Sequence, residues 1–222
     1  MTATSSQTPE SRAGGAVRRP RRAPNPDERL RDADRTRQAL LSAALDEFSE
    51  KGFDRARLQD IAARAGVNKQ LISYYFGGKE NLYREIQRGW QEHETTFVDP
   101  ALSLEEVADR YLAAGLADPR AARLMAWQGL TADAHTTDLT DDSVATDLAN
   151  LSRAKERGEI AAELDPAFVR TALMAIVMAP AVFPHAAVGP TGLKPGSKEF
   201  EDYYRGQLRA LLRRLGADSS PR

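Results

Sequence analysis

The sequence predicts an all-α fold, in which a small N-terminal three-helix unit precedes a larger helical unit. Apolar residues recur at helical spacing through most of the 222 residues, as Leu40, Ala44 and Phe48 illustrate, and no useful stretch alternates as a strand does. The hydrophobic fraction of 41% is sufficient for a buried core. We expect a disordered tail at 1–33, the three-helix unit at 34–80 and the larger unit at 81–217.

The tail is rich in Ser, Thr, Ala, Pro and Gly, and its only apolar residue larger than alanine before Pro26 is Val17, apart from Met1. Such a segment cannot bury enough surface to offset the entropy of ordering, so we expect disorder. The same stretch has one acid, Glu10, and five basic residues: Arg12, Arg18, Arg19, Arg21 and Arg22. Two interpretations stay open, a solubilising tail and a basic arm that lies on DNA phosphates.

Glycines and capping residues divide the region after the tail into four predicted helices. The first three belong to the small unit, and the fourth leads into the larger one. They are Asp34–Lys51, ended by Gly52; Leu58–Ala65, ended by Gly66; a helix capped by Asn68 with Ile72 and Phe76 inside, ended by Gly77-Gly78; and Lys79–Phe97, ended by Asp99-Pro100.

The larger unit begins after Ser103, which has Glu106 at capping-box spacing. Its predicted helices are Leu104–Ala117, Pro119–Leu130, Ser143–Arg157, Asp165–Ala179 and Ser197–Leu215, with loops at Thr131–Asp142 and His185–Gly196. The longest apolar run, 172–183, has twelve residues, whereas a membrane span needs about 20. We therefore expect a buried helix and no membrane partner.

The segment from Leu58 to Tyr83 carries the clearest functional motif, because two short helices joined at 65–68 have the geometry of a helix-turn-helix. Gly66 allows a positive φ in the turn. Lys69, Gln70, Ser73 and Tyr74 fall on the outer side of the second helix and are residue types that read base edges. The candidate DNA contacts are Arg57, Asn68, Lys69, Gln70, Ser73, Tyr74, Tyr75 and Lys79, with Arg57, Tyr75 and Lys79 facing phosphates.

Charge distribution supports a nucleic-acid partner for the N-terminal end. Residues 1–86 contain 16 Lys and Arg against 12 Asp and Glu, whereas the remainder contains 15 against 20. The alternative for each polar residue of the motif is that it is simply a solvated residue on the surface of a small helical bundle, with no role in DNA binding. The correct turn, cap and inner apolar positions together favour the DNA-binding interpretation.

The stretch Arg35–Ile86 resembles the N-terminal domain of the TetR family of bacterial regulators. The matching runs are Phe48-Ser-Glu-Lys-Gly-Phe53, Ala62-Ala-Arg-Ala-Gly-Val-Asn-Lys69, Tyr74-Tyr-Phe76 and Gly78-Lys-Glu-Asn-Leu-Tyr83, about 50 of 222 residues. Arg57 stands where the family usually has a Thr or Ser cap, and Gln70 and Leu71 stand where small residues are commoner. Both departures lie near the expected DNA surface, so they bear on which operator sequence is recognised rather than on the fold.

The resemblance implies a cytoplasmic, Ω-shaped homodimer that binds palindromic double-stranded operator DNA, represses transcription and is released by a small-molecule effector. The last two long helices would form a four-helix bundle with the partner, and the alternative is that both pack within one subunit. The expected interface residues are Phe168, Ala172, Leu173, Ile176, Phe200, Tyr204, Leu208 and Leu211. Effector binding would tilt the helix Lys79–Phe97 and change the spacing of the recognition helices.

The expected effector pocket is apolar, lined by Met and aromatic residues that suit an adaptable cavity. The candidates are Trp90, His93, Phe97, Met125, Trp127, Met174, Met178 and Phe183, and the competing interpretation is plain core. His93, His135 and His185 are far apart and lack acidic partners at metal spacing, so no metal or other cofactor is expected.

Two other function classes are alternatives to a regulator. An enzyme built on a helical bundle would need a nucleophile with its base, a phosphate-binding loop or a metal site, and none is evident. The sequence has no cysteine, which excludes disulfides and thiol catalysis and suits a reducing cytoplasm. A protein-interaction module with a degenerate helix-turn-helix would show no salt-sensitive, sequence-selective DNA binding.

Overall fold

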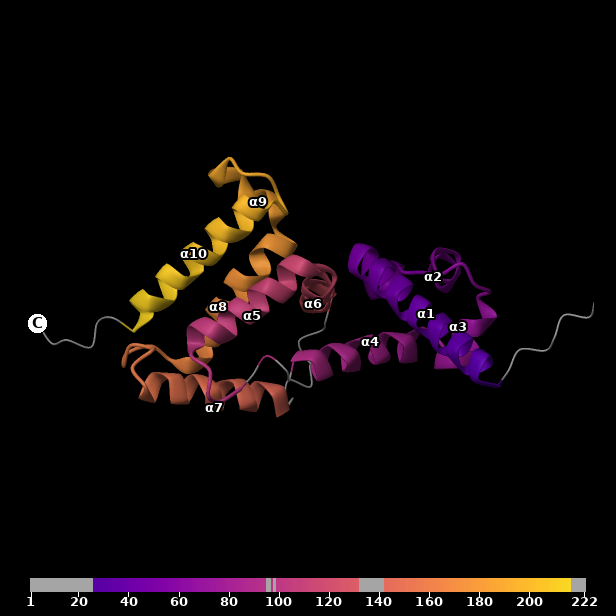
Figure 1. Cartoon of the computed structure of the whole chain (residues 1–222), viewed down its shortest axis with the longest axis horizontal. Coiled ribbons are helices and arrows are strands. Elements are labelled where there is room, and N and C mark those ends of the chain that lie inside the picture. The colour runs from indigo at the N-terminus through magenta and orange to yellow at the C-terminus, as the bar shows by residue number, and fades with distance from the viewer. Residues whose placement is uncertain (1–25, 95–96, 98, 132–141, 217–222) are drawn as a thin grey trace, which may run out of the picture.

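The computed structural model describes residues 26–94, 97, 99–131 and 142–216 (Figure 1). The arginine-rich residues of the predicted tail, most of the predicted loop Thr131–Asp142 and His135 lie outside these residues. The elements are α1 (Pro26–Arg55), α2 (Leu58–Arg64), α3 (Gln70–Phe76), α4 (Lys79–Glu94), α5 (Leu104–Ala117), α6 (Arg120–Thr131), α7 (Asp142–Glu156), α8 (Pro166–Val182), α9 (Pro184–Val188), the 3-10 turn η1 (Gly189–Thr191) and α10 (Lys198–Leu215).

The predicted all-α class is confirmed, since the described residues contain helices and no strand. Two local predictions were wrong. α1 begins at Pro26, whereas the sequence predicted a start at Asp34. α9 and η1 occupy the first part of the predicted loop His185–Gly196.

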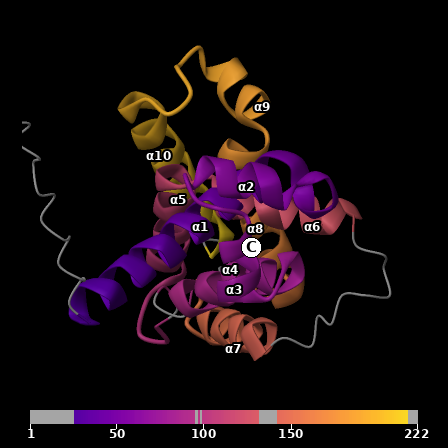
Figure 2. The same ribbon diagram turned by 90° about the vertical axis from the view of Figure 1, so that its right-hand side faces the viewer.

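The early start of α1 follows from helix propagation, because an existing helix extends through polar residues that offer no apolar signal. Thr36 donates its hydroxyl to the carbonyl of Asp32 at 2.8 Å within this exposed part, and Leu30 is 65% exposed. Figure 2 shows the N-terminal end of α1 projecting away from the other helices.

Two buried clusters form the cores of the two units. The first joins α1 to α2, α3 and α4 through Leu40, Phe48, Ile61, Ile72 and Leu82, each 0% exposed. The second joins α5, α7, α8 and α10; its members include Ala108, Leu112, Leu151, Val169, Leu208 and Leu212. Leu124 of α6 belongs to the first cluster although it lies in the second unit. The core of the small unit is therefore completed by a helix of the larger one.

α6 lies against α1 and forms the main joint between the units (Figure 1). The indole Nε1 of Trp127 donates to the carbonyl of Ser49 at 3.2 Å. Gly52, where α1 leaves helical geometry with φ 74° and ψ 169°, lies directly under the Trp127 ring. The predicted end of the first helix at Gly52 is thus confirmed, with the chain continuing to Arg55 beyond the kink.

Ion pairs surround this joint. Arg120 at the start of α6 donates to Asp46 of α1 at 2.7 Å and to Asp118 at 2.6 Å. These hydrogen bonds, first to Asp118 and then to Asp46, raise the pKa of Arg120, and the hydrogen bond from Arg120 lowers the pKa of Asp118. Asp46 also lies 3.7 Å from Arg64 of α2, so one carboxylate of α1 faces a cation from each unit.

Local signals set the ends of the C-terminal helices. Ser103 and Glu106 form the predicted capping box of α5. Asp165 accepts from the backbone amides of Ala167 and Phe168 and so caps α8. None of the described helices is by itself long and apolar enough to cross a membrane, although α8 and the segment Pro184–Thr191, bent by 100°, pass that test together.

Candidate functional sites

The turn between α2 and α3 has the geometry that its sequence predicts. Gly66 adopts φ 68°, and the next amide, of Val67, donates back to the carbonyl of Ala62 at 3.0 Å. Asn68 accepts from the amide of Gln70 at 2.9 Å through its side-chain oxygen, which confirms its predicted capping role. The turn and cap together fix the direction in which α3 leaves α2.

α3 presents one face to the core and the other to solvent. Ile72 and Phe76 are 0% and 8% exposed and pack in the first cluster. The predicted base-reading residues all fall on the outer side: Lys69, Gln70, Ser73 and Tyr74 are exposed, Tyr74 by 79%. Since side chains three and four residues apart share a helix face, these four form one continuous surface.

The three predicted phosphate contacts differ in accessibility. Arg57 is exposed just before α2, and its side chain makes no capping bond to that helix. Tyr75 is half-buried and packs against the first cluster. The ammonium of Lys79 donates to the carbonyl of Asp54 at 3.3 Å and lies 4.5 Å from the centre of the Phe53 ring. Lys79 therefore ties the start of α4 to the end of α1 in this structure, and its ammonium keeps two further donors for a phosphate.

Ion pairs hold α2 against α1. Arg64 donates to Glu50 at 2.8 Å, which lowers the pKa of Glu50 and raises that of Arg64. Glu47 is only 1% exposed and is paired with Lys51, whose pKa this hydrogen bond raises, and with Arg64. The outer face of α3 is therefore carried by a helix pair that is itself anchored.

Family comparisons fit this geometry. The model described as "Bacterial regulatory proteins, tetR family" matches residues 40–86, which span the helix-turn-helix. The model described as "Tetracyclin repressor-like, C-terminal domain" matches residues 103–214, half of the chain. The chain belongs to the TetR family. It is accordingly a DNA-binding transcriptional regulator, as its helix-turn-helix predicts.

Individual TetR-family relatives show where similarity is strongest. The HTH-type transcriptional repressor SCO4008 of Streptomyces coelicolor is 32% identical over 140 residues, which cover 59% of this chain and 70% of that protein. The HTH-type transcriptional regulator RutR of Escherichia coli K12 is 48% identical, but over only 61 residues, 28% of this chain and 29% of RutR. The chain therefore spans well under two thirds of RutR.

Solved structures show the same fold. The crystal structure of SCO4942 from Streptomyces coelicolor superposes with a TM-score of 0.66 at 27% identity and covers 82% of this chain and 98% of that one. A TetR-family regulator from Chloroflexus aurantiacus J-10-FL gives a TM-score of 0.56 at 20% identity, covering 82% and 93%. The second likeness is evidence of fold alone.

A cavity of about 1800 Å³ lies where the two units meet and is lined by residues of α1 and of α4 to α8. Five of the predicted pocket residues line it: Trp90, His93, Met125, Met174 and Met178. Phe97 is not among the lining residues, but its ring centre lies 4.9 Å from that of His93 and 5.3 Å from that of Tyr111.

Three of the predicted pocket residues, Phe97, Trp127 and Phe183, do not line this cavity. Trp127 does not line the cavity, because its ring covers Gly52 at the joint with α1. Phe183 is 64% exposed between α8 and α9. Tyr111, Asn150 and the Arg170–Asp147 ion pair also line the cavity, although the sequence did not predict them. Polar residues in the middle of helices carry no local signal of the side that they face.

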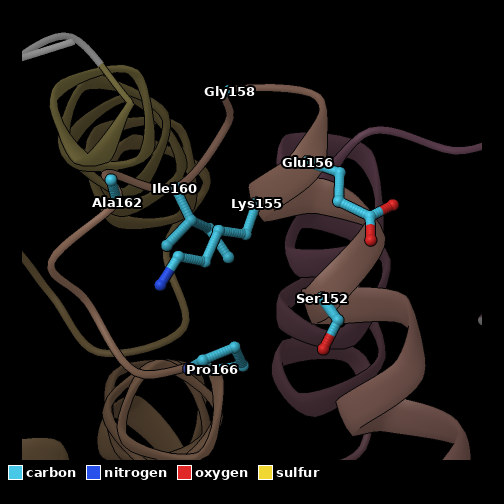
Figure 3. A pocket seen from close by; sticks show the side chains of 7 residues that line it. All are labelled: Ser152, Lys155, Glu156, Gly158, Ile160, Ala162 and Pro166. Atoms are coloured by element: carbon cyan, nitrogen blue, oxygen red, sulfur yellow. The ribbon is translucent and has the colours of Figure 1, made fainter.

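A smaller hollow of about 400 Å³ lies where α7 turns toward α8. Figure 3 shows Lys155 reaching across it toward the segment with Ala162 and Pro166. The Lys155 ammonium donates to the carbonyl of Leu164 at 2.7 Å. This lysine therefore fixes the connection between the two helices.

The predicted dimer residues on α8 and α10 divide into three groups by exposure. Phe200 and Leu208 are 1% and 3% exposed within their own subunit, so their assignment to the interface was wrong. Leu173, Ile176 and Tyr204 pack against the second cluster, and Ala172 is half-buried. Two predicted residues remain exposed, Phe168 by 66% and Leu211 by 43%, together with Tyr203, which the sequence analysis missed.

Proposed function

We propose that this regulator is a homodimeric repressor, held on a palindromic operator through α3 and released when a small effector binds in the cavity. The observation that carries this proposal is the continuous outer surface of α3, formed by Lys69, Gln70, Ser73 and Tyr74. Glutamine can pair with adenine and lysine with guanine in the major groove. Arg57 supplies an accessible cation for backbone phosphate.

The exposed apolar side chains of α8 and α10 support a second copy of the chain as partner. Phe168, Tyr203 and Leu211 are large, apolar or aromatic, and 43–66% exposed. Such groups on neighbouring helices gain free energy when a partner covers them. A two-fold dimer would place its recognition helices in successive major grooves, about 34 Å or a multiple apart, and so requires a near-palindromic operator.

The cavity supports effector control because its wall includes both units. Leu41 and Leu45 belong to α1, Trp90 to α4, and Met174 to α8. A ligand that fills the space touches the helices that carry α3 as well as the larger unit. Its differential affinity for two arrangements of α4 would shift the operator affinity by the same factor. We propose that the protein is a regulator rather than an enzyme and that it acts in the cytoplasm.

Operator binding is tested by footprinting and gel shift on DNA from upstream of the protein's own gene, at 50 and 200 mM salt. Lys69→Ala should weaken binding, and Gln70→Ala should change the preference among single-base operator variants. Lys198→Ala is the matched control, since this lysine is 82% exposed at the start of α10, away from α3. Equal binding by wild type and both α3 variants would reject the proposed recognition surface.

The oligomeric state is tested by sedimentation velocity. Phe168→Glu and Leu211→Glu should each shift the chain toward monomer, because a buried unpaired carboxylate opposes association. Leu130→Glu is the control, since Leu130 is 79% exposed on α6. If the control dissociates the dimer and the two test variants do not, the interface lies elsewhere.

A further inference from the structure

The cavity between the two units contains two buried hydrogen-bond donors that lack an acceptor among the described residues. They are the indole Nε1 of Trp90 in α4 and the amide Nδ2 of Asn150 in α7. Both residues line the cavity. Because a buried donor without a partner is unfavourable, a ligand that brings an acceptor to these two groups gains more than it would in water.

Both groups can act only as hydrogen-bond donors. An indole N–H only donates. The guanidinium of Arg153 donates to Oδ1 of Asn150. A guanidinium has no acceptor, so the oxygen of this amide must face Arg153, and Nδ2 is the atom left for the cavity. These two groups therefore call for acceptors, such as carbonyl or ether oxygens, rather than for donors.

The ionised groups that face the cavity already have partners. Arg170 donates to Asp147 at 2.9 Å, and Arg157 donates to Glu159 at 2.6 Å. Arg120 is paired with Asp118, and Glu85 with Arg37 and Arg88. The remaining lining acids, Asp54 and Asp99, are exposed at the rim. A charged ligand would have to displace one of these pairs or enter without a counterion, and both are costly.

The rest of the wall suits a flat apolar body. The rings of Trp90, His93 and Tyr111 line the cavity. Phe97, which is not a lining residue, lies between the last two, and the successive ring centres are 6.2, 4.9 and 5.3 Å apart. Met125, Met174 and Met178 provide flexible, polarisable contacts elsewhere in the lining. Ligand pockets commonly measure roughly 300–1,000 Å³, so the cavity has room for a bulky polycyclic molecule.

We propose that the effector is a neutral, flat and largely apolar molecule that brings a carbonyl-type oxygen to the free donor of Trp90 or to that of Asn150. The regulatory meaning of this ligand class rests on the proposed function. The binding itself can be measured on the full chain without DNA.

The test is equilibrium dialysis with four fused three-ring probes. These are 9-fluorenone, which is neutral and has a carbonyl; fluorene, which lacks it; 9-fluorenone-2-carboxylate, an anion; and proflavine, a cation. Fluorenone should bind roughly tenfold more tightly than fluorene, the effect of one well-placed hydrogen bond, and more tightly than either ion. Equal affinities for fluorenone and fluorene, or tighter binding of an ion, would overturn the proposal.

Variants assign the preference to the two donors. In the double variant Trp90→Phe and Asn150→Leu, the preference for fluorenone should fall to roughly threefold or less. Fluorene should bind this variant at least as tightly as it binds wild type, which also shows that the cavity is intact. Trp127→Phe, which alters an indole outside the cavity, should keep the full preference. A preference that survives the double variant would contradict the role given to both donors.

A gel shift on the same preparations separates the two proposals. If the operator is bound but the probes show no preference, the ligand class is wrong and the regulator stands. If the probes rank as expected but no DNA is bound, the assignment of the cavity stands and the proposed repressor function fails.

Discussion

Replacing Gly52 with alanine should loosen the joint between the two units. Gly52 combines φ 74° with ψ 169°, a region almost reserved for glycine, and another residue there costs roughly 1–3 kcal/mol. The added Cβ would also lie 3.1 Å from two atoms of the Trp127 ring, so that the indole has to shift. Such overpacking costs roughly 1–3 kcal/mol. Together these terms predict a loss of about 3 kcal/mol in the free energy of unfolding.

The assay is urea denaturation followed by far-ultraviolet circular dichroism at one fixed protein concentration. Gly66→Ala is the matched control, because Gly66 also has a positive φ, 68°, but nothing lies within 4 Å of its added Cβ. It should cost about 1 kcal/mol. In a Trp127→Ala background, where the ring is gone, Gly52→Ala should cost only its backbone strain. A Gly52→Ala cost no greater than that of Gly66→Ala, or one unchanged by removal of Trp127, would refute the reasoning.

Three further outcomes are expected. Asp165→Ala should lower the free energy of unfolding by about 1 kcal/mol, since it removes the cap accepted from Ala167 and Phe168, whereas Asp165→Asn should retain most of it. Tyr204→Phe should cost about 1 kcal/mol in urea titrations at neutral pH, because the hydroxyl donates to the carbonyl of Ile176 at 2.7 Å. Burial raises the pKa of Tyr204 and Tyr83 above their usual value near 10, so stability is complete below pH 10 and declines as the pH rises through the folded-state pKa values, less steeply in Tyr204→Phe. Arg120→Ala should cost about 1 kcal/mol at pH 7 after allowance for solvent screening of this half-exposed pair. Because Arg120 lowers the pKa of Asp118, that difference from wild type should shrink in denaturation series as the pH falls from about 5 through the lowered pKa; a constant difference would contradict the assignment.

Local chemistry made several features predictable from sequence. The capping box of Ser103 with Glu106 and the cap at Asn68 depend on residues only two or three positions apart, and both are confirmed. The outer face of α3 follows from the inner positions of Ile72 and Phe76, because helical spacing fixes one face once the other is known. The helix-turn-helix needed no information from distant residues.

Features that depend on tertiary packing were harder to predict. An apolar stripe on α10 does not reveal whether its own subunit or a partner covers it, and Phe200 and Leu208 proved to face their own core. Trp127 has the composition of a pocket residue, yet it packs on Gly52 of a helix 75 residues earlier in the chain. Trp90 and Asn150 line one cavity only because α4 and α7 border the same space.

The position of α6 limits how this regulator can be recombined with its relatives. The two family matches end at residue 86 and resume at 103, which suggests a convenient junction within or after α4 for chimeras that exchange sensor domains. Such a junction would leave Asp46 and the Ser49 carbonyl on one parent and Arg120 and Trp127 on the other. A working hybrid must therefore inherit α6 together with α1, or restore both contacts, so modularity in sequence exceeds modularity in structure.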